Sequence, residues 1–171
     1  RFNNFVIFIE KAIPGQKVLA YITKKKKDFA EAKIKEIISE SPFFTDPKCS
    51  HFPTCGGCKT QQLLYKEQLN QKKKQVEKIF EKQVGLDNFK VDRVVKADPI
   101  FNYRNKMEFT FSENRGGQKY LGLMIAQAEP YVFNLNECHL TSAWYSEVVA
   151  QVRKWWESGK LMAYNPPKNV G

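Results

Sequence analysis

The sequence predicts an α+β fold, and three observations support this prediction. Short β-rich segments separated by turn residues fill residues 1–45, a lysine-rich segment with helical periodicity follows residue 60, and β-rich segments return from residue 91 onward. Strands and helices that occupy separate stretches of a chain are typical of α+β proteins. We therefore expect a small OB-like β-barrel, followed by an antiparallel sheet with two main helices.

Residues 1–45 contain three segments that we expect to be strands. Two are compact apolar runs, at 5–9 and 18–22, and the turn at Pro14-Gly15 separates them. The third, 29–38, has a helix-favouring composition, but its apolar and charged residues alternate, so we interpret it as a strand. Three or four short strands joined by turns predict the barrel, an architecture often used to hold nucleic acid.

The middle of the chain predicts one long helix, from Thr60 to about Lys82. Thr60 is a candidate N-cap and Gly85 a candidate terminator. Four apolar residues between them recur at helical spacing, so we expect them to form a stripe that packs on the core. These residues are Tyr65, Leu69, Val76 and Phe80.

The remainder of the chain predicts an antiparallel sheet and a final helix. Strand-like segments occupy 91–95, 106–112, 120–125 and 131–135, with turn clusters between them. The final helix is expected to begin near Thr141 or Ser142 and to end near Gly159. Its large apolar residues at helical spacing are interpreted as core, and they are Trp144, Val148, Val152 and Trp155.

The cysteines form the most specific pattern in the sequence. Cys49, Cys55 and Cys58 are separated by five and two residues, and Cys138 lies far along the chain. Short spacers let one loop surround an ion or cluster, while a distant thiolate ties a remote segment to it. The Gly-Gly pair before Cys58 offers positive φ angles and room for N–H groups to approach the sulfurs. The four cysteines are therefore candidate metal ligands.

Other interpretations of the cysteines stay open at this point. They are alternatively buried small hydrophobes or two disulfides. Within metal sites, iron–sulfur is favoured over zinc, because the five-residue spacer lies nearer to the plant-type ferredoxin pattern than to zinc knuckles. His51 and His139 adjoin the proposed ligands and keep a mixed Cys/His zinc site possible.

The charge balance indicates a polyanionic partner. The formal net charge is +10, its excess is concentrated in residues 1–48 and 59–82, and 13% of the residues are aromatic. RNA or single-stranded nucleic acid is the leading candidate, and an anionic membrane surface is the lesser one. Simple solvation explains the lysine runs as well, and acidic neighbours in the sheet are alternative partners for the last two candidates. The candidate phosphate contacts are Lys24, Lys25, Lys26, Lys27, Lys72, Lys73, Lys74, Arg104 and Lys106.

Location follows from what the sequence lacks. No apolar run reaches the length of a transmembrane helix, and the first residues show no signal-peptide pattern. We expect a cytoplasmic protein without a membrane partner, in a reducing compartment that suits thiolate ligands. A monomer is the expected state.

Three segments together carry a resemblance to a known family. The pattern C-x5-C-G-G-C-x2-Q-x3-Y-x2-Q-L-x2-K, from Cys49 to Lys72, resembles the iron–sulfur branch of the RNA 5-methyluridine methyltransferases. Residues 12–16, Ala-Ile-Pro-Gly-Gln, look like a segment of that family's TRAM barrel. Residues 103–109, Tyr-Arg-Asn-Lys-Met-Glu-Phe, look like one of its strands. The resemblance covers nearly the whole chain.

The resemblance implies a domain organisation and a cofactor. Residues 1–45 would be a TRAM, OB-like barrel that this chain enters in its first turns, and 46–165 a central iron–sulfur-binding α/β domain. Residues 166–171 would begin a linker to a Rossmann-like methyltransferase domain that is not part of this chain. The four cysteines would hold a 4Fe-4S cluster, and the partner would be RNA, with ribosomal RNA as the expected kind.

The resemblance also implies a reaction for the full-length protein. It would be an S-adenosylmethionine-dependent RNA uracil-C5 methyltransferase, in which a cysteine thiolate adds to C6 of uracil and a base removes the C5 proton. With all four cysteines assigned to the cluster, we expect no catalytic residue here, so the chain would be an N-terminal RNA-binding fragment. The alternative is a stand-alone zinc or iron–sulfur nucleic-acid-binding module without catalysis. An electron carrier is disfavoured by the basic charge.

Overall fold

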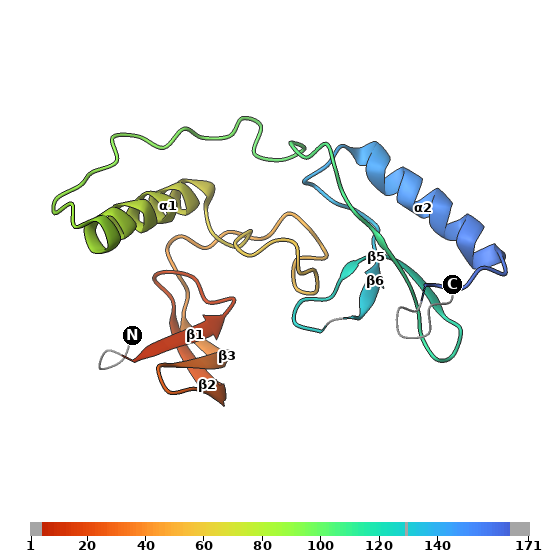
Figure 1. Cartoon of the computed structure of the whole chain (residues 1–171), viewed down its shortest axis with the longest axis horizontal. Coiled ribbons are helices and arrows are strands. Elements are labelled where there is room, and N and C mark those ends of the chain that lie inside the picture. Colours follow the sequence, from red (N-terminus) through yellow and green to blue (C-terminus); the bar gives the residue numbers. More distant parts are fainter. Residues whose placement is uncertain (1–4, 129, 165–171) are drawn as a thin grey trace. The chain divides into compact units, whose positions relative to one another are not determined.

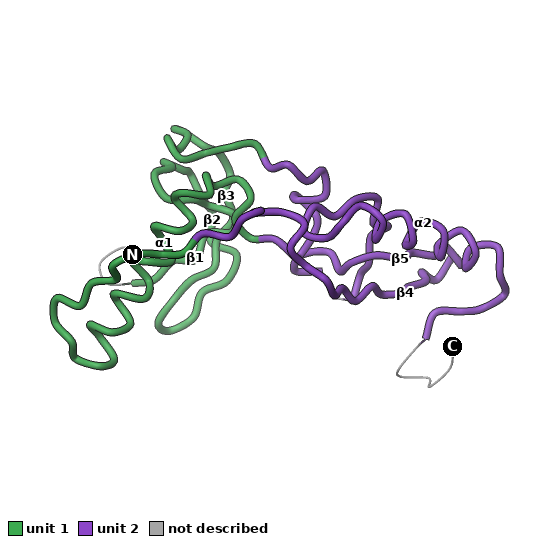
Figure 2. Tube along the Cα trace, turned by 90° about the horizontal axis from the view of Figure 1, so that it is seen from above, with its two compact units in different colours: residues 1–46, 59–95 green, residues 47–58, 96–171 purple. Residues whose placement is uncertain are grey.

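The computed structural model describes residues 5–128 and 130–164, and it confirms the predicted α+β class (Figure 1). The chain forms two compact units (Figure 2): unit 1 comprises Arg1–Asp46 and Lys59–Val95, and unit 2 comprises Pro47–Cys58 and Lys96–Gly171. The expected domains at 1–45 and 46–165 stay a prediction, and the expected linker at 166–171 lies outside the described residues. No helix in the described part of the chain is long and apolar enough to cross a membrane.

Unit 1 contains a three-stranded sheet in the order β1-β3-β2, formed by β1 (Val6–Glu10), β2 (Lys17–Lys25) and β3 (Phe29–Ser39). β3 runs parallel to β1 and antiparallel to β2. Alternate residues of β3 are buried, with Ala30 and Ala32 only 1% and 3% exposed, so the interpretation of this segment as a strand is confirmed. Within residues 5–128 and 130–164 this sheet is open, and the OB-like barrel stays a prediction.

The helix of unit 1, α1, spans Tyr65–Ile79, and a π-helical segment, Phe80–Val84, extends it. Gly85 ends it at φ 71°, as predicted from glycine's tolerance of left-handed backbone. The predicted start was wrong. Thr60 belongs to a preceding turn, in which the Leu63 N–H donates to the Thr60 carbonyl at 3.1 Å. The Gln68 side chain also donates to that carbonyl at 3.0 Å, so the first helical residue is Tyr65.

The predicted apolar stripe of α1 is not a buried core. Tyr65, Leu69 and Phe80 are half-buried, and Val76 is 40% exposed. Within α1 the buried residue is Glu67, whose carboxylate accepts hydrogen bonds from the side chains of Asn70 and Gln71. The helical spacing was detected correctly, but spacing alone does not show that a partner surface covers the stripe.

Unit 2 contains an antiparallel sheet in the order β4-β5-β6, formed by β4 (Thr110–Glu113), β5 (Lys119–Met124) and β6 (Val132–Asn134). The antiparallel arrangement was predicted, but two predicted strands were wrong in extent. Residues 91–95 form no strand, because the Val91 N–H donates to the Glu77 carboxylate of α1 instead. Residues 106–109 precede the ladder, and upstream of them Arg104 makes only an isolated bridge with Thr141.

The final helix, α2 (Ala143–Ser158), runs along this sheet in Figure 1. Ser142 and Gly159 flank it, as predicted. The core between helix and sheet consists of Leu121, Leu135, Val149 and Trp156, each at most 4% exposed. Close packing also explains a glycine in β5, because a Cβ at Gly122 would lie 2.0 Å from a carbonyl oxygen of β6.

The core face predicted for α2 was wrong. Trp144, Val148 and Trp155 are 54%, 49% and 61% exposed, and only Val152 of the predicted stripe packs against the core. Trp156 takes the buried place, and its ring packs edge to face on Phe111 with the centroids 4.8 Å apart. Both sets have helical spacing, so the choice between them depends on the sheet that the helix covers.

Candidate metal centre

The four predicted ligands, Cys49, Cys55, Cys58 and Cys138, all lie in unit 2, and all are half-buried. The first three lie on a loop that is bent by local hydrogen bonds. The N–H groups of Thr54 and Cys55 both donate to the His51 carbonyl, at 2.9 and 2.7 Å. These contacts keep the loop compact without requiring a bound ion.

The tip of this loop is attached to the end of β5. The Gly56 N–H donates to the Met124 carbonyl at 3.2 Å, and the Ala126 N–H donates to the Thr54 carbonyl at 2.8 Å. A Cβ at Gly56 would lie 3.4 Å from the Met124 oxygen, so glycine allows this close approach. Sheet hydrogen bonds therefore fix where the loop lies within unit 2.

The Gly-Gly pair meets one of its two expectations. The Gly57 N–H lies 3.3 Å from the Cys55 sulfur, which is the N–H to sulfur approach that the sequence predicts. The expectation of positive φ was wrong, because neither Gly56 nor Gly57 has a positive φ. A glycine is needed here for space and not for left-handed backbone.

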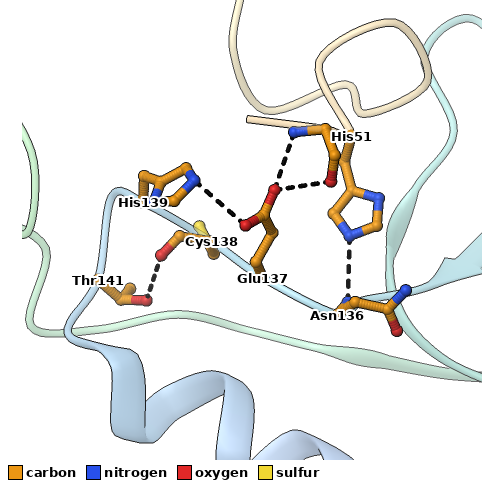
Figure 3. Close-up of polar contacts among 7 residues, drawn as sticks. His51, Asn136, Glu137, Cys138, His139 and Thr141 are labelled. Carbon is orange, nitrogen blue, oxygen red and sulfur yellow. Dashed lines mark hydrogen bonds and ion pairs between the residues drawn. The ribbon is translucent and has the colours of Figure 1, made fainter. Parts of the chain in front are cut away.

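A network of side chains, here called the clasp, joins the segment that begins at Cys49 to the segment that contains Cys138 (Figure 3). The Ser50 backbone N–H and hydroxyl both donate to one Glu137 carboxylate oxygen, at 2.9 and 2.6 Å. The other carboxylate oxygen lies 3.3 Å from His139 Nε2. The Asn136 N–H donates to His51 Nε2 at 3.1 Å. The clasp comprises Ser50, His51, Asn136, Glu137 and His139.

The clasp places two cysteines in adjacent positions of paired segments. Cys49 directly precedes Ser50, and Cys138 directly follows Glu137. The paired residues are 87 positions apart, so the chain has folded back on itself over a long distance to make this contact. The fold thus brings the remote cysteine segment to the cysteine loop.

Burial and charge both disfavour the thiolate of Cys49. Burial raises its pKa first, and the negative potentials of Glu137, Cys55 and Cys58 add to this effect, while a backbone hydrogen bond at His51 opposes it. The pKa of Glu137 is lowered, mainly by the hydrogen bonds from Ser50. Three thiols and a carboxylate thus act on one another here, and a positively charged group would relieve the repulsion.

Both histidines use the same ring nitrogen within the clasp. His51 Nε2 accepts a hydrogen bond from Asn136, so its lone pair is engaged. His139 Nε2 faces Glu137. In this arrangement neither histidine offers Nε2 to a metal ion, and the cysteines are the better donors.

The donors fit a four-thiolate site in chemistry and in the pairing of their segments. None of the four cysteines forms a disulfide. Cys138 packs against the core cluster of unit 2. The thiols are not gathered, however: no three His, Cys, Asp or Glu side chains among the described residues are grouped so as to hold a metal ion.

The candidate RNA contacts fall in both units. Lys24 and Lys25 end β2, the next two lysines form the turn to β3, and all four are exposed. Lys72, Lys73 and Lys74 lie on α1, whereas Arg104 and Lys106 lie in unit 2. Lys106 forms an ion pair with Glu108 at 3.2 Å, which is one of the alternatives considered for it.

Glu137, Ser50 and Asn136 were missed by the sequence analysis. A signal was present, because polar residues directly adjacent to proposed ligands often orient them. Two such positions so far apart in the chain could not be paired without the fold.

Replacing Glu137 with alanine is expected to loosen the cysteine loop in the metal-free protein. The Ser50 amide would lose its acceptor, and hydrogen exchange at this amide should accelerate about fivefold or more, the factor for a hydrogen bond worth about 1 kcal/mol. NMR hydrogen exchange measures this rate. Glu147→Ala, on an exposed position of α2, is the matched control. Unchanged exchange at Ser50 would contradict a role of the clasp in holding the loop.

The chain is similar to several curated proteins. It is 36% identical over 159 residues to an uncharacterized RNA methyltransferase of Protochlamydia amoebophila, a match that covers 93% of this chain and 36% of the relative. It is 33% identical over 171 residues to one of Clostridium acetobutylicum, with 99% and 37% covered. It is 43% identical over 115 residues to one of Caldanaerobacter subterraneus, with 67% and 25% covered.

No family model matches the chain. The chain spans 36% and 37% of the length of the first two of these relatives. Identity above 30% over more than nine tenths of the chain indicates common descent. The chain is therefore related, over nearly its whole length, to proteins that are named RNA methyltransferases.

Proposed function

We propose that these residues form the RNA-binding, iron–sulfur part of an S-adenosylmethionine-dependent RNA uracil-C5 methyltransferase. The observation that carries the proposal is the similarity of nearly the whole chain to about a third of proteins named RNA methyltransferases. The cysteine pattern and the segment 103–109 narrow the class to the uracil-5 enzymes by resemblance. The methyl donor and the catalytic nucleophile are assigned to the portion of the relatives that this chain does not span.

Cys49, Cys55, Cys58 and Cys138 would hold a 4Fe-4S cluster. When bound, the cluster would supply four metal–thiolate bonds that cross-link the cysteine loop to the segment before α2, adding to the stability of unit 2. The clasp already holds the same two segments together by hydrogen bonds. Thiolate ligation agrees with the proposed cytoplasmic location, where thiols stay reduced.

RNA, with ribosomal RNA as the proposed kind, would be bound by the basic surface of unit 1. Lys24 to Lys27 are exposed beside one another at the β2–β3 turn, and most of the basic excess lies in segments that include this unit. Exposed lysines contact phosphates without reading sequence, so this surface would supply affinity and position, not the choice of uridine.

Neutralising two lysines of the β2–β3 turn is expected to weaken RNA binding and its salt dependence. In Lys25→Gln/Lys26→Gln, the slope of log Kd against log salt should fall by about one for each lost phosphate contact. Fluorescence anisotropy with single-stranded RNA at several salt concentrations measures the slope. The control Lys154→Gln/Lys160→Gln removes the same charge from exposed positions of unit 2. Equal slopes in the two variants would show that the turn makes no specific contribution.

The proposed reaction is tested on the gene product that contains these residues. Methylation at C5 of uracil displaces the C5 proton, so RNA carrying tritium at C5 of its uridines should release tritium in the presence of S-adenosylmethionine. Methyl transfer without tritium release would assign a different atom of RNA as the target. No transfer to any RNA would contradict the proposed function.

A further inference from the structure

A groove in unit 1 has no role in the function proposed so far. It encloses about 720 Å³ beside the first turns of α1. Its walls come from three segments: residues 42–43 after β3, residues 64–73 at the start of α1, and residues 92–94. The groove residues used below are Phe43, Leu64, Lys66, Glu67, Lys73 and Arg93.

Backbone hydrogen bonds fix these walls in place. The Leu64 N–H donates to the Phe43 carbonyl at 2.9 Å, and Phe44 forms a bridge with Leu63. The third wall is attached to α1 by the Val91 N–H, which donates to Glu77 at 3.1 Å. The groove is therefore built by unit 1 before any ligand arrives.

The floor of the groove is apolar and open. Phe43 is 37% exposed and Leu64 is 42% exposed, although both belong to hydrogen-bonded segments. Sites for small ligands typically enclose about 300 to 1,000 Å³ and combine apolar walls with a few polar groups. An exposed aromatic ring in such a groove is a surface on which a planar base stacks.

Cations line the groove above this floor. Lys66, Lys73 and Arg93 contribute three positive charges, and Glu67 and Asp92 contribute two negative ones. Glu67 is buried, and hydrogen bonds from Asn70 and Gln71, at 3.0 and 2.5 Å, lower its pKa and occupy both carboxylate oxygens. Its charge thus faces these amides at the base of the groove, and the cations outnumber the one remaining acid, Asp92.

We propose that this groove binds one unstacked nucleobase of single-stranded RNA, with Phe43 stacking on the base and Lys66, Lys73 and Arg93 contacting the adjacent phosphates. The proposal rests on the proposed RNA-binding function and assigns one base position to it. Charge complementarity and the aromatic floor favour RNA over an acidic protein segment, which would use the cations but would have no need of stacking. The proposal also separates Lys73 from Lys72, which does not line the groove.

The test compares stacking with phosphate contact in the full 171-residue chain. Binding of a fluorescein-labelled single-stranded oligoribonucleotide is measured by anisotropy for Phe43→Leu, Lys66→Gln/Lys73→Gln and the control Lys72→Gln. Phe43→Leu should weaken binding about tenfold without changing the salt slope, because stacking is lost and no charge changes. Lys66→Gln/Lys73→Gln should lower the slope by about two units. Circular dichroism checks that each variant keeps its fold.

An oligoribonucleotide series with one abasic position gives a second, independent measurement. At the position that occupies the groove, removal of the base should weaken binding to the wild-type chain, and Phe43→Leu should then have no further effect. Equal binding by the wild type and Phe43→Leu on every oligoribonucleotide would overturn the groove proposal and leave RNA binding standing. Failure of the wild type to bind any RNA would overturn both proposals. Binding of poly-glutamate that depends on these residues, with unchanged RNA binding, would assign the groove to an acidic protein segment.

Discussion

Cys138→Ser is expected to abolish assembly of the cluster. In the proposed site the wild-type chain, reconstituted without oxygen, should hold about four irons and four sulfides, and the variant fewer than about one of each. The reason is the distance of this ligand along the chain. Cys49, Cys55 and Cys58 share one short loop, whereas Cys138 alone attaches the loop to a remote segment.

Iron and sulfide analysis, with the visible absorbance of the cluster, measures the loss. Because Cys138 packs against the core of unit 2, the variant must also be shown to fold. The metal-free forms of wild type and Cys138→Ser should unfold at urea concentrations that differ little, since serine is close to cysteine in volume. Full iron retention in a folded variant would remove Cys138 from the ligand set. Stoichiometric zinc without sulfide would support the zinc-binding alternative.

Local signals explain the parts of the fold that were predicted correctly. Alternation of small and charged residues identified β3, and glycine at φ 71° ended α1 at Gly85. Ser142 and Gly159 marked the ends of α2. Each of these features depends on residues within one or two turns of the chain, so the sequence contains enough information to place them.

Long-range contacts explain the parts that were not predicted. The start of α1 was wrong because the Gln68 side chain holds Thr60 in a turn. The predicted strand at 91–95 was replaced by a loop that Glu77 holds. In both places a side chain distant in sequence competes with the local preference, and the local pattern contains no record of that competition.

The candidate site divides in the same way. The spacing of the four cysteines and the Gly57 approach to sulfur could be anticipated from the sequence. The Ser50–Glu137 contact could not, because it joins residues 87 positions apart. Whether the thiols gather around a cluster stays a prediction, since the described residues show no such group.

Trp156→Ala is expected to destabilise unit 2 severely. Its side chain is 2% exposed and belongs to the cluster with Leu121, Leu135 and Val149. Removing a buried tryptophan costs about 3 to 5 kcal/mol, because the lost transfer free energy adds to that of the cavity left behind. Small domains are stable by only about 5 to 15 kcal/mol, so a large fraction of this stability would be lost. Urea unfolding followed by circular dichroism, with hydrogen exchange of the α2 amides, measures the loss.

Trp155→Ala is the matched control, because it removes the same side chain from the adjacent position of the same helix. Trp155 is 61% exposed, and a surface substitution of this kind should change the free energy of unfolding by no more than about 0.5 kcal/mol. The pair therefore measures which face of α2 packs on the sheet. The stripe first inferred from helical spacing contained Trp155 and not Trp156, so the opposite ranking of the two variants would restore that stripe. The ranking expected here follows from Phe111, which packs edge to face on the Trp156 ring, and from Lys119, whose ammonium group lies 5.2 Å from its centroid.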